Sequence, residues 1–103
     1  MEGHSVISAD ILASYAADAA LGIEGVRAVV EGSRPRHHGV KVVTDEEAVA
    51  VELHLAVEWG LNVPDIGARV QMRVAEYLST MADLTPATVD VIVDEIGPPP
   101  EGA

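Results

Sequence analysis

Apolar and polar side chains alternate most regularly over residues 48–59. One face carries Val49, Val51, Leu53, Leu55 and Val57, and the other carries Glu52, His54 and Glu58. Successive side chains of a strand point to opposite faces, so this alternation predicts a strand with one buried and one outward face. Such a strand is typical of an antiparallel sheet covered on one side. Shorter strands are predicted at residues 26–31, 39–44 and 88–96.

Two segments repeat apolar residues every three or four positions, which predicts helices. The first begins after Ser8, whose hydroxyl can cap free N–H groups, and ends at Gly22 or Gly25, where glycine takes a left-handed conformation. The second begins at Pro64 and ends before Pro86. The predicted apolar stripes are Ile11, Leu12, Tyr15, Ala16, Ala19 and Ala20 in the first helix, and Ile66, Val70, Val74, Tyr77, Leu78 and Met81 in the second.

The segment 58–71, EWGLNVPDIGARVQ, connects the longest predicted strand to the second helix. Trp59, Gly60, Asn62 and Pro64 are predicted to form a structural corner rather than a binding site. Gly60 is expected to adopt a backbone conformation that bulkier residues resist, and Pro64 suits the first turn of a helix.

The elements follow one another as helix, three strands, helix, strand. This order predicts an α+β two-layer sandwich, in which two helices cover one face of a mainly antiparallel sheet of about four strands. Residues 1–96 are predicted to form a single domain. The tail 97–103, GPPPEGA, is predicted to be disordered because it is rich in proline and glycine.

The charge of the chain limits its partners. Seventeen acidic residues oppose six basic ones, a formal net charge of −11, which disfavours nucleic acid and anionic lipid as direct partners. The 103 residues contain no cysteine, no positively charged start typical of a secretory signal and no apolar run long enough to span a membrane. The sequence therefore predicts a cytoplasmic protein that does not insert directly into a membrane.

One basic cluster interrupts this acidic background. Four of the six basic residues lie within fifteen positions, namely Arg27, Arg34, Arg36 and Lys41. Together with His37 and His38, the arginines of the loop 32–38 can dock an acidic partner or an anion. The alternative is a solvated loop whose charges offset nearby acids.

The outward face of the longest strand offers a second candidate surface. Glu52 and His54 share that face, where they could serve as an acid–base pair or as metal ligands, or simply face solvent. Ala50 and its small neighbours Ala48 and Ala56 would let another subunit approach, and the alternative is that they simply face solvent. Residues 22–25 match the GxxG of KH-type RNA-binding loops, but Glu24 favours a plain helix end over a phosphate clamp. No catalytic residue, metal or cofactor is predicted.

The chain resembles the alkaline shock protein family, the envelope stress response proteins of Gram-positive and related bacteria. The similarity covers residues 7–96, and its motifs are GIEGV (22–26), GVKV (39–42), VELHLAVEWGLNVPDIGARVQ (51–71) and VDVIVDEI (89–96). The aromatic–Gly corner, the apolar–Pro pair and the helical Gln of the family correspond to Trp59-Gly60, Val63-Pro64 and Gln71. The chain departs from the family in its scarcity of lysine, its proline-rich tail and its loop GSRPRHH.

The resemblance implies a small protein without catalytic activity that self-associates or docks to membrane-anchored partners near the cell envelope, often after stress. The leading hypothesis is thus a non-enzymatic scaffold or interaction module, peripheral at the membrane through a protein partner, that forms at most a weak homo-oligomer. Two rival hypotheses remain. One is a regulatory module that binds an anion or nucleic acid through loop 32–38, and the other is a metal-dependent enzyme that uses Glu52 and His54.

Overall fold

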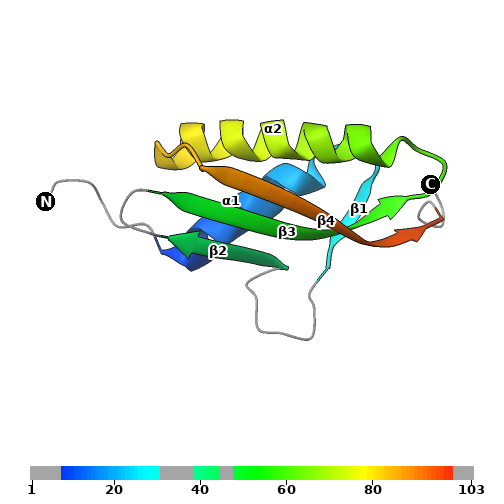
Figure 1. Ribbon diagram of the computed structural model, residues 1–103, viewed down its shortest axis with the longest axis horizontal. Helices are drawn as coiled ribbons and strands as arrows, with labels where there is room; N and C mark the ends of the chain where they lie inside the picture. Colours follow the sequence, from blue (N-terminus) through cyan, green and yellow to red (C-terminus); the bar gives the residue numbers. More distant parts are fainter. Residues whose placement is uncertain (1–7, 31–38, 45–47, 99–103) are drawn as a thin grey trace, which may run out of the picture.

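The computed structural model describes residues 8–30, 39–44 and 48–98. Within these residues the elements occur in the predicted order α-β-β-β-α-β (Figure 1). They are α1 (Ala9–Leu21), β1 (Val26–Val29), β2 (Val40–Thr44), β3 (Val49–Glu58), α2 (Val63–Ala82) and β4 (Thr88–Gly97). The α+β class predicted from the sequence is confirmed. The predicted end of the last strand, Ile96, falls one residue short, because buried Gly97 completes β4.

β3 is the central strand of the sheet and pairs along both of its edges. On one edge, β2 pairs antiparallel with the first half of β3, and β1 pairs antiparallel with the second half. On the other edge, β4 runs parallel to β3 along its full length, because α2 carries the chain back between them. The sheet is therefore mainly antiparallel, with one parallel pair. We call the edge of β4 that faces away from β3 its second edge. Among the described strands none pairs with this second edge.

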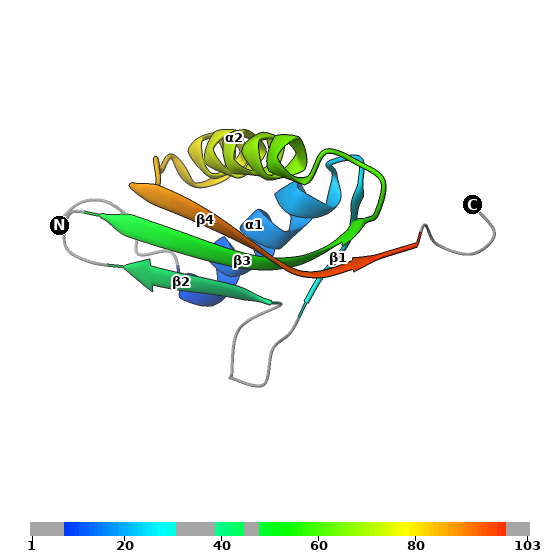
Figure 2. The ribbon, with the colours of Figure 1, turned by 45° about the vertical axis from the view of Figure 1, so that its right-hand side comes forward.

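Both helices lie on the same face of the sheet, as Figures 1 and 2 show. The core forms between them and the inward side chains of the strands, chiefly those of β3. Its largest fully buried members are Leu12, Val40, Val51, Leu53, Leu55, Val57, Val70, Val74 and Leu78. Burial of these aliphatic side chains is the main favourable contribution to folding, and it leaves the opposite face of the sheet outside the core.

The predicted helical stripes need two corrections. Ile11 was expected to be inward but is 46% exposed, whereas Ala13 and Ala17 are buried. In α2 the inward face holds from Ile66 to Leu78, but Met81 is exposed. In α1 the alanines occur on several sides of the helix, so the apolar pattern does not mark which of them face the sheet.

The helix ends follow local capping chemistry. The Ser8 hydroxyl accepts a hydrogen bond from the Ile11 N–H at 3.2 Å, as expected for an N-cap. Gly22 ends α1, but its φ of −81° is right-handed, so the predicted left-handed cap is wrong there. The positive φ occurs instead at Gly25 (98°), in the turn before β1. Asp83 caps α2 with a φ of 53°.

The corner between β3 and α2 is built by backbone geometry. Gly60 has a φ of 83°, a left-handed conformation that side chains disfavour. The Asn62 side chain accepts a hydrogen bond from the Asp65 N–H at 3.0 Å and so caps α2. Pro64 lies in the first turn of that helix, where a missing N–H has no partner to lose.

Candidate interaction surface

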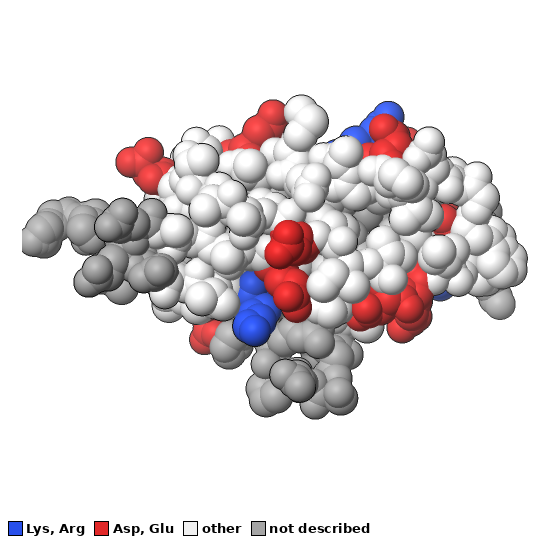
Figure 3. Space-filling model, viewed as in Figure 1, with Lys and Arg blue, Asp and Glu red and all other residues white. Residues whose placement is uncertain are grey.

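The sheet face that points away from the helices is the outer face. β3 contributes its even-numbered residues, β2 contributes Lys41 and Val43, and β4 contributes Asp90 and Ile92, by the register of the strands. None of the described helices packs on this face, and acidic side chains lie across it beside a small basic patch (Figure 3). The predicted surface residues Ala50, Glu52 and His54 therefore lie together on an open face.

His54 is held at the centre of this face between two carboxylates. Its Nε2 lies 2.8 Å from Oε2 of Glu52, and its Nδ1 lies 2.8 Å from Oδ2 of Asp94. The imidazole ring is only 12% exposed. Each ring nitrogen therefore has one carboxylate oxygen within hydrogen-bond distance. The three side chains thus form a bridge, the His54 bridge, that ties β3 to β4.

Asp94 reaches this bridge because of an irregularity in β4. The register passes from Leu55 opposite Val93 to Ala56 opposite Glu95, so Asp94 is an extra residue between two pairs. Such a bulge changes the direction of a side chain. No local sequence pattern indicates Asp94, because its partner lies 40 residues earlier in the chain.

The His54 bridge does not have the geometry of a metal site. A transition metal requires ligands that converge on one point at about 2.0–2.2 Å. Here the two carboxylates lie on opposite nitrogens of the same ring, so their oxygens diverge around it. Nowhere in the described ranges do three or more His, Asp or Glu residues gather as metal ligands.

The other predicted interaction residues, Arg34, Arg36, His37 and His38, lie outside the described residues. Binding of an anion through loop 32–38 therefore stays a prediction. Residues 45–47 also lie outside the described residues. At the corner, Trp59 is an exposed aromatic residue.

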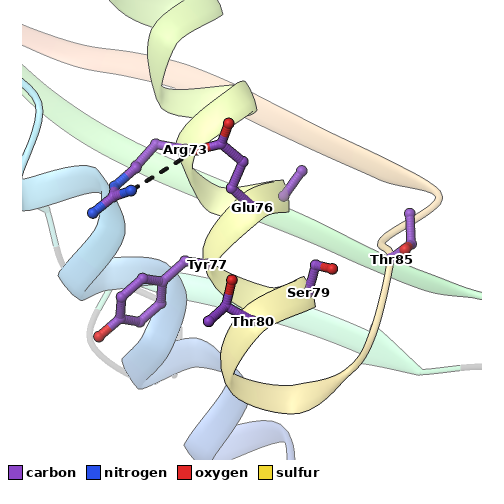
Figure 4. A pocket seen from close by; sticks show the side chains of 7 residues that line it. Arg73, Glu76, Tyr77, Ser79, Thr80 and Thr85 are labelled. Atoms are coloured by element: carbon purple, nitrogen blue, oxygen red, sulfur yellow. Dashed lines mark ion pairs between the residues drawn. The ribbon is translucent and has the colours of Figure 1, made fainter.

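A hollow of about 620 Å³ lies along the second half of α2. Its side chains do not converge on one point. Arg73 and Tyr77 extend toward α1, whereas Ser79 extends toward the segment that carries Thr85 (Figure 4). Nη1 of Arg73 lies 3.8 Å from Oε1 of Glu76, and its guanidinium carbon lies 5.9 Å from the centroid of the Tyr77 ring. Arg73 thus contacts its neighbours on α2, and we assign it a structural role.

A second hollow, of about 290 Å³, is a groove between the first half of α2 and β4. We call it the edge groove. The residues that line it are small or aliphatic, apart from Gln71, and include Val63, Gly67, Ala68, Val91 and Val93. The side-chain amide of Gln71 donates a hydrogen bond to the Val89 carbonyl oxygen at 2.9 Å. The sequence had indicated Gln71 only through the family motif.

These features define a class of protein: a small two-layer α+β domain whose helices cover one sheet face, while no described residue covers the acidic outer face or pairs with the second edge of β4. A family model for the alkaline shock protein 23 family, described as having a cell envelope-related function, matches residues 1–98. The chain belongs to this family, which confirms the resemblance found in the sequence.

Two further comparisons concern the fold and the curated proteins. A solved structure of MamM with a valine-to-arginine substitution is similar at a TM-score of 0.54 and 9% identity, over 85% of this chain and 94% of that chain. At this identity the likeness concerns the fold alone. No curated protein matches the chain. Of the described helices, none is both long and apolar enough to cross a membrane.

Proposed function

We propose that this protein is a non-enzymatic interaction module or scaffold in a cell envelope-related process, and that it reaches the membrane through a protein partner. The observation that carries the proposal is the one-sided sheet, in which α1 and α2 cover one face and leave the outer face open. Among the described residues no helix covers this face, so it is available for a partner. The family description supplies the envelope context.

The chemistry of the outer face supports binding rather than catalysis. Its most buried polar group, His54, is engaged at both ring nitrogens, so neither nitrogen is directed at a substrate. The small side chain of Ala50 lies beside it on β3, where it allows close approach of another backbone, whereas Ala56, also expected on this surface, is buried at 4% exposure. A non-obligate interface is on the whole about as apolar as the rest of a protein surface, so the polar character of this face is compatible with a partner that binds and dissociates.

The test compares two arginine substitutions that add the same charge on opposite sides of the molecule. Ala50→Arg places a long side chain on the outer face, and Met72→Arg replaces a side chain on α2 that is 66% exposed. The chain is expressed in its native host, cross-linked in living cells and recovered from the envelope fraction. We expect partner proteins with the wild type and Met72→Arg, and fewer with Ala50→Arg.

Two results would refute the proposed function. One is a chain that never enters the envelope fraction, and the other is recovery without any cross-linked partner. Equal recovery with Ala50→Arg and Met72→Arg would remove the outer face from the proposal.

A further inference from the structure

The second edge of β4 carries backbone groups that point away from the sheet. In β3, the His54 N–H donates to the Gly39 carbonyl at 3.3 Å, and the His54 carbonyl accepts from the Val30 N–H at 2.7 Å. The backbone of His54 therefore faces the edge shared by β1 and β2. Backbone direction alternates along a strand, so the odd-numbered residues of β3 face β4, in agreement with the 2.8 Å bond from the Ala87 N–H to the Val49 carbonyl.

The same alternation then fixes the direction of the β4 backbone. The register sets Val51 opposite Val89 and Leu53 opposite Val91. In a parallel pair the bonding residues of the two strands are offset by one, so the peptide groups of Asp90 and Ile92 face β3. Those of Val89, Val91 and Val93 face the second edge.

The Gln71 side chain supports this assignment, because its amide reaches the Val89 carbonyl from outside the sheet. Gln71 thereby satisfies the first carbonyl of the second edge. The peptide groups of Val91 and Val93 follow next along that edge, directly beside the edge groove that the same valines line. An unpaired edge with a groove alongside is the arrangement that accepts an added strand and its side chains.

Charge restricts which strand can be added. On the outer side of β4, Asp90 and Glu95 have no ion-pair partner among the described residues, and no basic residue occurs within β4. A second copy of β4 would bring these acidic side chains against their own kind. Like charges on neighbouring strands are destabilising, so a basic segment fits this edge and a second copy does not.

We propose that the second edge of β4 binds an extended segment of a protein partner as a fifth strand. In that segment, small apolar side chains enter the edge groove and the alternate, basic side chains lie beside Asp90 and Glu95. This inference rests on the proposed function, since it specifies how a partner of the interaction module binds. Main-chain hydrogen bonds to Val91 and Val93 supply affinity, and the groove supplies selectivity.

The experiment uses a synthetic probe on the full chain. The probe is an acetylated peptide of roughly six residues in which valine and lysine alternate, about the length of an ordinary strand. A matched control peptide carries methyl groups on alternate backbone nitrogens, which removes N–H donors and keeps the charge. Binding is followed by the NMR shifts of backbone amides. We expect shifts at Val91, Val93 and the first half of α2, and binding about tenfold weaker for the methylated peptide.

Gly67 provides the matched pair of protein variants. A Cβ built at Gly67 meets nothing within 4 Å, so Gly67→Ala fits without a clash and the longer side chain of Gly67→Leu begins in open space. Gly67→Leu fills the groove, whereas Gly67→Ala leaves most of it open. We expect Gly67→Leu to weaken binding of the valine–lysine peptide about tenfold and Gly67→Ala to keep it within about twofold.

Three results would overturn the inference: no binding, equal binding of the methylated peptide, or equal binding by Gly67→Leu. The last two would mean that charge alone attracts the peptide. Amide shifts at Val91 and Val93 that grow with protein concentration alone would assign the edge to a second copy. The inference about the edge can fail while the proposed function stands. If cross-linking recovers partners equally with wild type and Gly67→Leu but not with Ala50→Arg, the interaction module stands and the edge does not.

Discussion

At the scale of single residues, the His54 bridge makes a prediction about stability. His54 links Glu52 on its own strand to Asp94 on β4, and the two carboxylates are 37% and 34% exposed. Because solvent screens such partly exposed groups, we expect His54→Ala to lower the free energy of unfolding by about 1 kcal/mol. A double-mutant cycle of His54→Ala with Asp94→Ala in urea should give a coupling of about 0.5–1.5 kcal/mol.

Glu95→Ala is the control for this cycle. Glu95 is adjacent to Asp94 in sequence and also exposed, but no contact joins it to His54. Its effect should therefore add to that of His54→Ala. Additive effects for Asp94→Ala as well would contradict the bridge.

Two glycines make a second residue-scale prediction, because they share open surroundings and differ in backbone. A Cβ at Gly60 or at Gly67 meets nothing within 4 Å. Gly60 has a φ of 83°, so Gly60→Ala should cost about 1–2 kcal/mol in strain alone. Gly67 lies inside α2, so Gly67→Ala should stabilise the protein by about 0.5–1 kcal/mol. Urea unfolding curves show whether each substitution lowers or raises the free energy of unfolding. A change in the same direction for both variants would contradict this prediction.

A residue's role can be predicted from the sequence when its partners lie close to it along the chain. Ser8 caps the helix that follows it within three residues, and such a role could be predicted from the neighbouring pattern. Asp94 and Gln71 could not be found this way. Their partners, His54 and Val89, are placed by a bulge and by strand register, which local patterns do not specify.

At the scale of elements, α2 makes a third prediction. Ile66 is 5% exposed and faces the core, whereas Met72 on the same helix is 66% exposed. Ile66→Ala should therefore lower the free energy of unfolding by about 2–5 kcal/mol, because it leaves a cavity. Met72→Ala is the matched control and should change it by less than about 0.5 kcal/mol. Thermal and urea unfolding of both variants test which face of α2 is buried. Equal unfolding midpoints for the two variants would mean that Ile66 does not lie on the buried face.

The two helices also show where an apolar pattern predicts packing and where it does not. In α2, charged residues such as Arg69 and Arg73 alternate with the aliphatic stripe, so the inward face could be predicted from Ile66 to Leu78. In α1, alanines lie on most sides. The choice of Ala13 over Ile11 for the core is made by the approach of α2 and the sheet, which the helix sequence alone does not contain.

At the scale of the whole molecule, a net charge of −11 governs how two copies meet. The outer face adds to this effect, because Glu52, Glu58 and Asp90 all lie on it. Close approach of two such faces is opposed by repulsion that salt screens, with a Debye length of about 10 Å at 0.1 M ionic strength. The open sheet face still offers the small residue Ala50 for packing. These opposing effects predict a weak homo-oligomer whose formation requires salt.

Sedimentation equilibrium at low and high salt tests this prediction. The wild type should be monomeric at low salt and should associate at high salt, where repulsion between the outer faces is screened. Ala50→Arg should prevent association by placing a long side chain in the interface, whereas Met72→Arg adds the same charge on α2 and should leave association intact. A chain that stays monomeric at every salt concentration would exclude the homo-oligomer. Association that Ala50→Arg does not change would place the contact between copies elsewhere than on the outer face.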